Sequence, residues 1–450
     1  MQRKVTTLFG GRKVLLRGTD RPVTPLGGLS VFFEFLGHIG YAQAVKRSMP
    51  VQLRSPNAID PAHTFTTFLV SVLAGARRFA HTGWIRGDRA LHRMLGILRL
   101  PTDDTIRNLF SRFGMAQVQR FYSALWDWQL ERLPQRKDGY SLDLDSTVFE
   151  RYGKQEGAAR GFNPKKHGRP SHHPLLAVLA EAHFVLHGWL RSGNCGASRG
   201  GVEFLKEALA LLGENHRLRL VRADAGFFED SFLRFLEERE LPYVVVCRMT
   251  KRLRHRAAGI KDWQMVDPTY AVGAFPAQLL GWDRERRFVV VREQIREDKR
   301  SVGRKLLEVP GYTFRLFVTN TKEDPEVLWR DYNQRADVEK RIGELKYDLA
   351  ADDFCMRKFF ATETAFRAIL MLFNLLSEFQ RASGMKGYRQ PATLRSQVFL
   401  CGAILGCAGH HPVIHLSNSW GGIRTRICLL DHIFSYVFPT SPKLENECTP

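Results

Sequence analysis

The stretch DYNQRADVEKRIGELKYD, residues 331–348, carries charged and aromatic side chains at helical spacing. At about 100° per residue, four of them fall within a sector about 60° wide, beside an apolar face. These four are Tyr332, Arg335, Glu339 and Lys346. One acid is therefore set between two cations and a phenol. The stripe belongs either to a functional site or to a solvated face with ordinary ion pairs, and matching carboxylates elsewhere in the chain would favour the site.

The composition favours a protein of two or three domains that binds a polyanion. The chain has 450 residues, 44% of them hydrophobic, which is enough for sizeable cores. Its 67 Lys and Arg against 46 Asp and Glu give a net charge of +21. Nucleic acid is the expected partner, because it offers a dense line of phosphates.

The composition also indicates a compartment. The apolar runs at 65–76 and 399–409 are too short to span a bilayer, and the first residues lack the apolar region of a signal peptide. Seven scattered cysteines favour reduced thiols over a disulfide framework. The sequence therefore predicts a cytoplasmic protein, or one located wherever the DNA is, with no membrane partner.

Apolar periodicity predicts helices in the N-terminal part of the chain and a mixed sheet after it. Residues 1–139 have apolar residues at helical spacing, and Pro101 with Thr102 marks a helix start. The basic helix that follows would fit a helix-turn-helix, although any helical hairpin would look similar. In residues 140–250, strand-like and helix-like segments alternate, which is typical of a mixed α/β sheet.

The rest of the chain divides into three segments. Residues 251–320 contain strand-like pieces between Gly, Pro and charge clusters, which predicts a β-rich insertion. The α/β pattern resumes at 321–384, where Asp324 is expected to cap a helix with Pro325 in its first turn. A long apolar helix near the end of this segment is most simply a core helix. Residues 385–450 form a C-terminal region without a clear pattern.

Two further carboxylates stand at the expected ends of strands. Asp145 follows the strand-like LDL, and Asp224 closes RLRLVRAD. Strand ends lie on the rim of a sheet where ligands bind, although Asp is also a common turn former there. With Glu339 they give three acids without a histidine or thiol partner, a set that suits Mg²⁺ or Mn²⁺. Two such ions about 3.5–4 Å apart can drive attack on a phosphodiester, so the sequence predicts metal-dependent phosphoryl transfer on nucleic acid.

The spacing Y-x2-R-x3-E-x6-K, from Tyr332 to Lys346, resembles the signature of a large group of bacterial insertion-sequence transposases. Residues 142–177 and 221–228 also resemble that group, specifically the insertion-sequence family numbered thirteen-eighty. The resemblance covers about residues 20–430. It implies a DDE catalytic triad and an α/β fold: a ribonuclease-H-like mixed sheet with a β-rich insertion, preceded by an all-α DNA-binding domain.

The resemblance also implies roles for the three acids. Asp145, Asp224 and Glu339 would be the catalytic residues and the ligands of two Mg²⁺ or Mn²⁺ ions. The first acid of the family directly precedes Ser-Thr, which selects Asp145, while Asp143 on the same strand face is its main rival. In some relatives an insertion tryptophan stacks on a flipped base, but for Trp263 and Trp282 core packing is the simpler role.

Two basic segments are expected to contact DNA. One is the stripe itself, and the other is the loop GFNPKKHGRPSHHP at 161–174, for which a solvated basic loop is the alternative. The predicted DNA-binding residues are Tyr332, Arg335, Lys346, Lys165, Lys166 and Arg169. A metal site at His172 and His173 is disfavoured, because adjacent strand residues point to opposite faces.

The resemblance therefore implies a bacterial transposase that acts at the nucleoid and binds the terminal inverted repeats of its mobile element as a homodimer on paired ends. It would cleave the ends and join the 3′-hydroxyl to double-stranded target DNA by two-metal phosphoryl transfer, in a cut-and-paste reaction. Two alternatives stay open. One is a metal-dependent DNA nuclease on the same fold, and the other is an inactive DNA-binding relic of a transposase.

Overall fold

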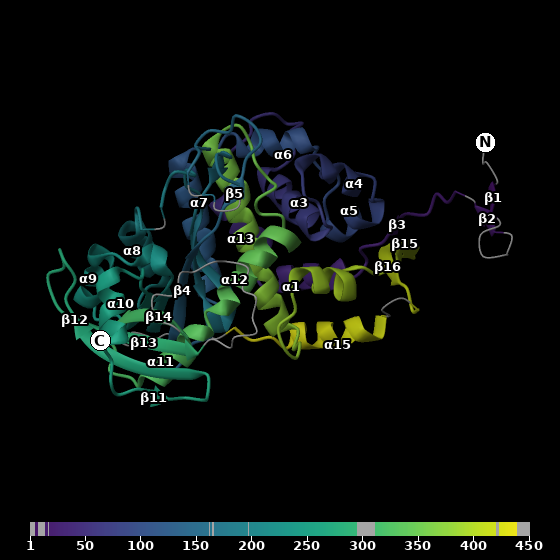
Figure 1. The fold of residues 1–450 in the computed structure, drawn as a ribbon. Helices are drawn as coiled ribbons and strands as arrows, with labels where there is room; N and C mark the ends of the chain where they lie inside the picture. The colour runs from purple at the N-terminus through teal and green to yellow at the C-terminus, as the bar shows by residue number, and fades with distance from the viewer. Residues whose placement is uncertain are drawn as a thin grey trace, which may run out of the picture. The chain divides into compact units, whose positions relative to one another are not determined.

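The chain forms two compact units in the computed structural model, whose elements are labelled in Figure 1. The first unit comprises Met1–Lys46, Gln52–Ile106 and Phe379–Tyr436, and the second comprises Arg47–Val51, Arg107–Glu378 and Val437–Pro450. The structure describes residues 18–161, 163, 166–196, 198–294, 311–419 and 423–438, and the backbone of the paired strands β1 (Val5–Thr7) and β2 (Val14–Leu16). The functional division of the chain into five segments stays a prediction.

Helices make up most of the first unit and of the segments where the chain passes from the first unit to the second. They are α1 (Leu29–His38), α2 (Tyr41–Ser48), α3 (Pro61–Leu73), α4 (Gly83–Arg86), α5 (Arg89–Leu95), α6 (Asp103–Phe110), α14 (Pro391–Leu394) and α15 (Ile423–Phe434). The helix start expected at Thr102 is confirmed, because its hydroxyl accepts a hydrogen bond from the amide of Thr105 at 3.1 Å. Helices predicted for this part of the sequence are therefore present.

The first unit is not purely helical. Strand β3 (Val23–Thr24) pairs antiparallel with β15 (Ala403–Ala408), which pairs antiparallel with β16 (His411–Leu416). Its core contains a cluster of four buried phenylalanines with ring centroids 5.4–6.0 Å apart. These are Phe32, Phe35, Phe379 and Phe399. Segments from both ends of the sequence thus share one core.

A nine-stranded mixed sheet dominates the second unit, in the order β11-β12-β13-β14-β10-β9-β4-β7-β8. Its first strands in the chain are β4 (Tyr140–Ser146), β7 (Leu175–Leu179), β8 (Phe184–Trp189), β9 (Leu218–Ala223) and β10 (Tyr243–Val246). β4, β7 and β8 form an antiparallel meander. β9 runs parallel to β4, and β10 runs parallel to β9. The predicted mixed α/β sheet is confirmed.

The strand-like pieces at 251–320 continue this sheet. They form β11 (Gln264–Met265), β12 (Tyr270–Ala277), β13 (Arg286–Gln294) and β14 (Tyr312–Thr319), all joined in antiparallel pairs. β14 pairs antiparallel with β10, so the β-rich segment extends the central sheet beyond its parallel strands. Helix α10 (Lys251–Ala258) precedes these strands, and Thr250 caps it.

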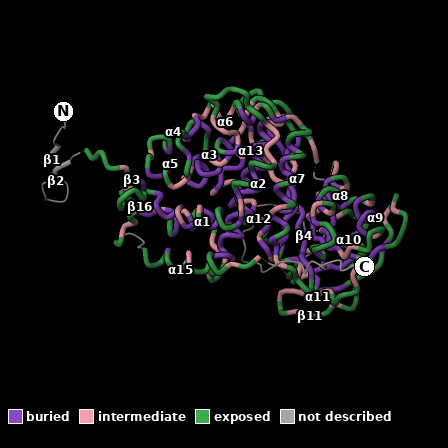
Figure 2. The backbone as a smooth tube through the Cα atoms, turned by 180° about the vertical axis from the view of Figure 1, so that it is seen from behind, coloured by how far each residue is buried: buried purple, intermediate pink, exposed green. Residues whose placement is uncertain are grey.

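Helices α7 (Met115–Leu130) and α13 (Phe359–Ala382) pack against the other end of the sheet. Trp126 of α7 and Asn374 of α13 both donate hydrogen bonds to the carbonyl oxygen of Val185 in β8, at 3.0 and 2.9 Å. Figure 2 shows α13 as a mostly buried helix. It is long and apolar enough to cross a membrane, but 83% of its apolar 18-residue segment is buried inside the protein. The predicted core helix is thus confirmed.

Helices α8 (Gly201–Leu212) and α9 (Asp230–Glu238) connect the parallel strands. Each buries an apolar face; that of α8 includes Phe204 and Leu205, and that of α9 includes Phe232 and Leu236. The crossovers let β4 and β9 run in the same direction, so their carboxyl ends lie at one edge of the sheet. That edge carries the candidate site.

Candidate active site

Two of the predicted acids are in register at one sheet edge. In the parallel pair of β4 and β9, Leu144 lies opposite Ala223, so Asp145 and Asp224 are the next positions along each strand. The Oδ1 atom of Asp145 accepts a hydrogen bond from the amide of Ser146 at 2.7 Å. The Oδ1 atom of Asp224 accepts one from the amide of Gly226 at 3.0 Å, where the strand turns into a short 3₁₀ helix.

The single helix expected over 331–348 is wrong. The structure has α11 (Pro325–Asn333), α12 (Ala336–Gly343) and a π-helical turn at Glu344–Asp348. Between the two helices, the amides of Gln334 and Arg335 bond to carbonyl groups three residues earlier, so the chain is wound more tightly there. The predicted start is confirmed, because Asp324 caps α11 through the amide of Glu326 and Pro325 follows it. The four side chains therefore do not form the stripe that was expected for one regular helix.

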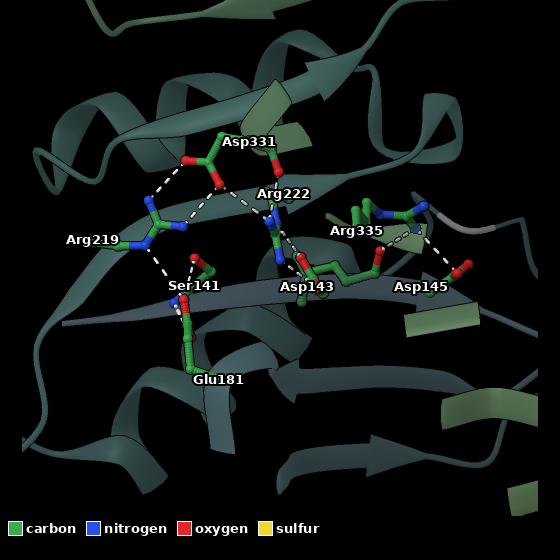
Figure 3. Close-up of polar contacts among 9 residues, drawn as sticks. Ser141, Asp143, Asp145, Glu181, Arg219, Arg222, Asp331 and Arg335 are labelled. Atoms are coloured by element: carbon green, nitrogen blue, oxygen red, sulfur yellow. Dashed lines mark hydrogen bonds and ion pairs between the residues drawn. The ribbon is translucent and has the colours of Figure 1, made fainter. Parts of the chain in front are cut away.

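Arg335, at the start of α12, contacts the first acid. Its side chain is only 5% exposed, and its Nη2 atom lies 3.1 Å from Oδ2 of Asp145 and 2.8 Å from the carbonyl oxygen of Leu144. Figure 3 shows its guanidinium directed at Asp145. The solvated-face alternative is therefore excluded for Arg335 in this structure.

The charges of the other two predicted acids act on Asp145. The pKa of Asp145 is raised to about 6, mainly by its burial; the charges of Asp224 and Glu339 add to the rise, and Arg335 opposes it. Burial also acts against the charge of Arg335, yet its pKa is raised because Asp145 leads the acids around it. The two pKa shifts are consistent with each other, because Arg335 faces mainly opposite charges whereas Asp145 faces two like charges. Glu339 itself is exposed in the first turn of α12.

Asp143 has a different partner from Asp145. It is 1% exposed, and its two oxygens accept hydrogen bonds from Nε and Nη2 of Arg222 at 2.6 and 2.9 Å. Burial raises its pKa, and the charges acting on it are those of Arg222, Arg335 and Glu181. Asp224 and Glu339 act on Asp145 instead, which supports the choice of Asp145 as the first acid.

A charge network extends from Asp143 to α11 (Figure 3). Nη1 of Arg222 donates to the carbonyl oxygen of Asp331 at 2.7 Å, and Arg219 donates two hydrogen bonds to the Asp331 carboxylate at 2.7 and 2.8 Å. Glu181 accepts from the amide and hydroxyl of Ser141 and completes the group. Strands β4 and β9 are thus tied to the helix that precedes Arg335.

The sequence reasoning missed this network, although it contains a usable signal. Arg222 stands two residues before Asp224, as Asp143 stands two residues before Asp145. Residues two apart on a strand share a face, so neighbouring strands would bring Asp143 and Arg222 together. Without knowing that β4 and β9 are neighbours, the pairing could not be derived.

The other residues of the predicted stripe have mainly internal contacts. Tyr332 is 8% exposed and packs on Phe317, with ring centroids 4.8 Å apart. Burial raises the pKa of its hydroxyl. Lys346 lies in the π-helical turn, and its Nζ donates to the carbonyl oxygen of Val148 at 3.0 Å.

The basic loop lies near a cavity of about 550 Å³ next to Asp145. Lys166 lines that cavity and pairs with Glu150 at 2.8 Å, while the guanidinium of Arg169 lies 4.5 Å from the ring centre of Tyr152. Lys165 lies outside the described residues. The cavity wall consists of Ser146, Thr147, Val148, Glu150, Tyr152, Asn163, Lys166, Lys346, Tyr347, Asp352 and Asp353.

The candidate histidines and tryptophans are used in packing. His172 accepts from Nε of buried Arg151 at 2.9 Å, and His173 contacts the carbonyl oxygen of Cys195 at 2.7 Å. Trp282 packs near the rings of Phe228 and Phe288. Trp263 donates to the carbonyl oxygen of Ile260, and the guanidinium of Arg292 lies 4.4 Å from its ring centre.

A family model described as "Transposase DDE domain group 1" matches residues 6–431. No curated protein matches the chain. One similar solved structure is a cryo-EM structure of the piggyBac transposase synaptic complex with hairpin DNA, at 13% sequence identity and a TM-score of 0.44. That similarity covers 85% of this chain and 83% of the other.

The network predicts a structural role for Asp143. Asp143→Ala should lower the free energy of unfolding by about 3–5 kcal/mol, because it leaves buried Arg222 without its carboxylate partner. Urea unfolding measures the change. Arg330→Ala, which removes an exposed pair with Glu326, should cost about 1 kcal/mol or less. Equal losses in the two variants would contradict the structural role.

The raised pKa predicts a pH-dependent cost of folding from Asp145. The folded protein retains this proton up to about pH 6, whereas the unfolded chain loses it near the usual value of 3.8, so stability falls as pH rises between these values. Relative to wild type, Asp145→Asn should therefore gain about 2 kcal/mol between pH 4 and pH 6.5. Unfolding curves in buffer with a chelator measure the difference. A pH-independent difference would show that Asp145 titrates normally.

Proposed function

The chain belongs to the transposase DDE domain family of group 1, and from this premise we propose that it moves a DNA element by cutting and pasting its ends. It binds the terminal inverted repeats, cleaves at the ends and joins the 3′-hydroxyl to target DNA. Within the family we assign it to the insertion-sequence family numbered thirteen-eighty, on the Y-x2-R-x3-E-x6-K spacing from Tyr332 to Lys346. A homodimer that pairs the two ends is part of the proposal.

The sheet topology supports a ribonuclease-H-like core. Three consecutive strands, β4, β7 and β8, form an antiparallel meander, and β9 and β10 then add parallel to β4 on its other side. This arrangement brings the ends of the two acid-bearing strands together at one edge. The position of a carboxylate at that edge is typical of a ligand site in an open α/β sheet.

The observation that carries the proposal is that two acids end adjacent strands and that the charge of a third acid, from a distant part of the chain, acts on one of them. Asp145 and Asp224 end adjacent parallel strands, and Glu339 adds its charge from α12. Nothing in the packing of the sheet requires like charges at this place, and they raise the cost of burying Asp145. A site that accepts such a cost is a candidate for function.

The donor set fits a hard divalent cation. DDE transposases generally use divalent metals, and Mg²⁺ and Mn²⁺ prefer carboxylate oxygens such as those of Asp145, Asp224 and Glu339. In the described parts of the chain, no group of three His, Cys, Asp or Glu side chains is arranged to hold an ion, so the carboxylates would have to draw closer. When bound as two ions, the metal would activate a water or DNA hydroxyl and stabilise the leaving oxygen.

The chain's own residues would position the substrate beside these acids. Lys346 and Lys166 line the cavity next to Asp145, and their ammonium groups suit phosphate oxygens of a DNA strand. We place Arg169 in the same contact surface, with the neighbouring Lys165 as a further candidate. Tyr332 and Arg335 are buried here, so they would reach DNA only after a local rearrangement.

A second basic surface in the first unit supports binding of the DNA outside the cleavage site. Exposed arginines on α4 and α5 line a cavity of about 800 Å³, together with His92. They are Arg86, Arg89 and Arg93, and no acid lines the cavity within the described residues. The nearby acid of α5, Asp88, is used as the cap of that helix. The cavity therefore suits a polyanion, and we propose that it holds the phosphate backbone of the repeat DNA.

Two other functions remain alternatives to be tested. A metal-dependent nuclease on the same fold would cleave DNA without joining strands. A DNA-binding relic would do neither, and the three acids at one edge count against it. An assay with a DNA substrate that carries the element's terminal repeat separates them, because it scores binding, end cleavage and joining to a target plasmid independently.

Removal of any one of the three acids should abolish chemistry and leave binding intact. Asp145→Asn, Asp224→Asn and Glu339→Gln are expected to reduce cleavage and strand transfer by at least about 10³-fold, since each neutralises a metal ligand. Gel-shift assays should show wild-type affinity. Asp337→Asn is the matched control, because Asp337 is exposed on α12 beside Glu339 and pairs only locally with Lys340. Retained cleavage in one acid variant removes that residue from the triad.

The second basic surface predicts a change in salt dependence. The Arg86→Ala, Arg89→Ala and Arg93→Ala triple variant should flatten the slope of log K against log salt by about 0.9 per lost phosphate contact. Its melting temperature should stay close to wild type, because the three side chains are exposed. Arg120→Ala, Arg234→Ala and Arg239→Ala, three exposed positions in the second unit, change the net charge equally and serve as the control. An equal slope in both triple variants would argue against a local surface.

A further inference from the structure

Arg335 is held less tightly than the other buried arginine of the site. Its Nη2 atom makes both contacts, to Oδ2 of Asp145 and to the carbonyl oxygen of Leu144. Its Nε is buried and has no hydrogen-bond partner in the part of the chain that the structure describes. Arg222, by contrast, bonds to Asp143 through two nitrogens and to Asp331 through a third. The Arg222 side chain is therefore fixed through three nitrogens, whereas the Arg335 side chain is fixed through one.

The backbone around Arg335 is also a junction. It joins α11 to α12 through hydrogen bonds of the i to i−3 type, at Gln334 and Arg335 themselves. Short 3₁₀ segments within helices often mark hinges. The side chain can therefore change its contact with Asp145 without breaking the regular hydrogen bonds of either helix.

Charges of both signs act on Asp145. The main contributions come from the cation Arg335 and the acids Asp224 and Glu339, and the amide of Ser146 donates a hydrogen bond. Without Arg335, three acids would share the sheet edge with no positive side chain among these groups. With a divalent ion on the same carboxylate oxygen, the guanidinium would face a like charge at short range.

We propose that Arg335 occupies the cation position at Oδ2 of Asp145 in the metal-free protein, and that it must leave this oxygen before a divalent ion binds. The inference rests on the proposed function only in that Asp145, Asp224 and Glu339 are the metal ligands. Arg335 then acts as a positioning residue: it holds the first acid in place while the site is empty, and it delays metal loading until it is displaced.

The competing arrangement keeps Arg335 on Asp145 after the metal has bound. A carboxylate oxygen has two lone pairs, so one could accept from the guanidinium while the other bound the ion. In that case Arg335 would orient the ligand and its removal would weaken metal binding. The two arrangements therefore predict opposite changes in affinity when the guanidinium is removed.

Mn²⁺ binding to the full-length protein without DNA distinguishes them. Isothermal titration calorimetry should show that Arg335→Gln binds Mn²⁺ at least about tenfold more tightly than wild type. Lys340→Gln removes the same charge from an exposed position of α12 and should change the affinity by less than about threefold. Adding Asp145→Asn to Arg335→Gln should cancel the gain, which places the effect at this carboxylate. Equal or weaker binding by Arg335→Gln would overturn the proposal.

A structural measurement covers the case in which Arg335→Gln does not fold. In crystals of the wild-type protein grown with Mn²⁺, the guanidinium of Arg335 should be beyond hydrogen-bond distance of both Asp145 oxygens. Mn²⁺ bound to Asp145 with Arg335 still about 3 Å from that carboxylate would overturn the proposal and leave the proposed function standing. If neither protein binds Mn²⁺ at these acids, the metal chemistry of the proposed function fails together with this inference.

Discussion

Repulsion of the Asp145 carboxylate by the charges of two other acids is the constraint on which the candidate site depends. Asp145 and Asp224 are brought together because β4 and β9 run parallel, and Glu339 adds a third negative charge from α12. Burial makes this repulsion more costly, since the dielectric screening of water is reduced. The surrounding structure must therefore hold the acids in place by contacts that the acids themselves do not supply.

Buried ion pairs next to the site provide these contacts. Arg222 joins β9 to Asp143 of β4 and to the backbone of Asp331 in α11, and Arg219 holds the Asp331 carboxylate from the same strand. A buried pair stabilises a fold only when its hydrogen bonds are well satisfied, and Arg222 meets that condition. Because α11 leads directly into α12, fixing Asp331 also limits where Glu339 can lie. Asp143 thus influences the site through the positions of β4, β9 and α11.

Part of this arrangement could be predicted from the sequence and part could not. Local patterns were sufficient for the mixed sheet, the cap at Asp324 and the strand-end positions of Asp145 and Asp224, since each depends on neighbours in sequence. The break between α11 and α12 and the burial of Arg335 depend on contacts with β4, nearly 200 positions away in the chain. A periodicity calculated for one regular helix contains no information about such contacts. The DNA-binding role that the sequence predicts for Arg335 therefore takes no account of the contact between its guanidinium and Asp145.

The arginines of this chain therefore divide by burial rather than by their share of the +21 charge. A buried guanidinium such as that of Arg222 is committed to carboxylates and carbonyl groups, and its charge is largely cancelled before any substrate arrives. Exposed arginines such as Arg86 and Arg89 remain available to phosphates, because their interactions with the protein are few and screened by water. Arg335 lies between these classes: it is buried, yet its Nε lacks a partner among the described residues. A charge held in this intermediate way can be displaced at small structural cost. A site that is stable without its cation, and that must still accept one, requires this property.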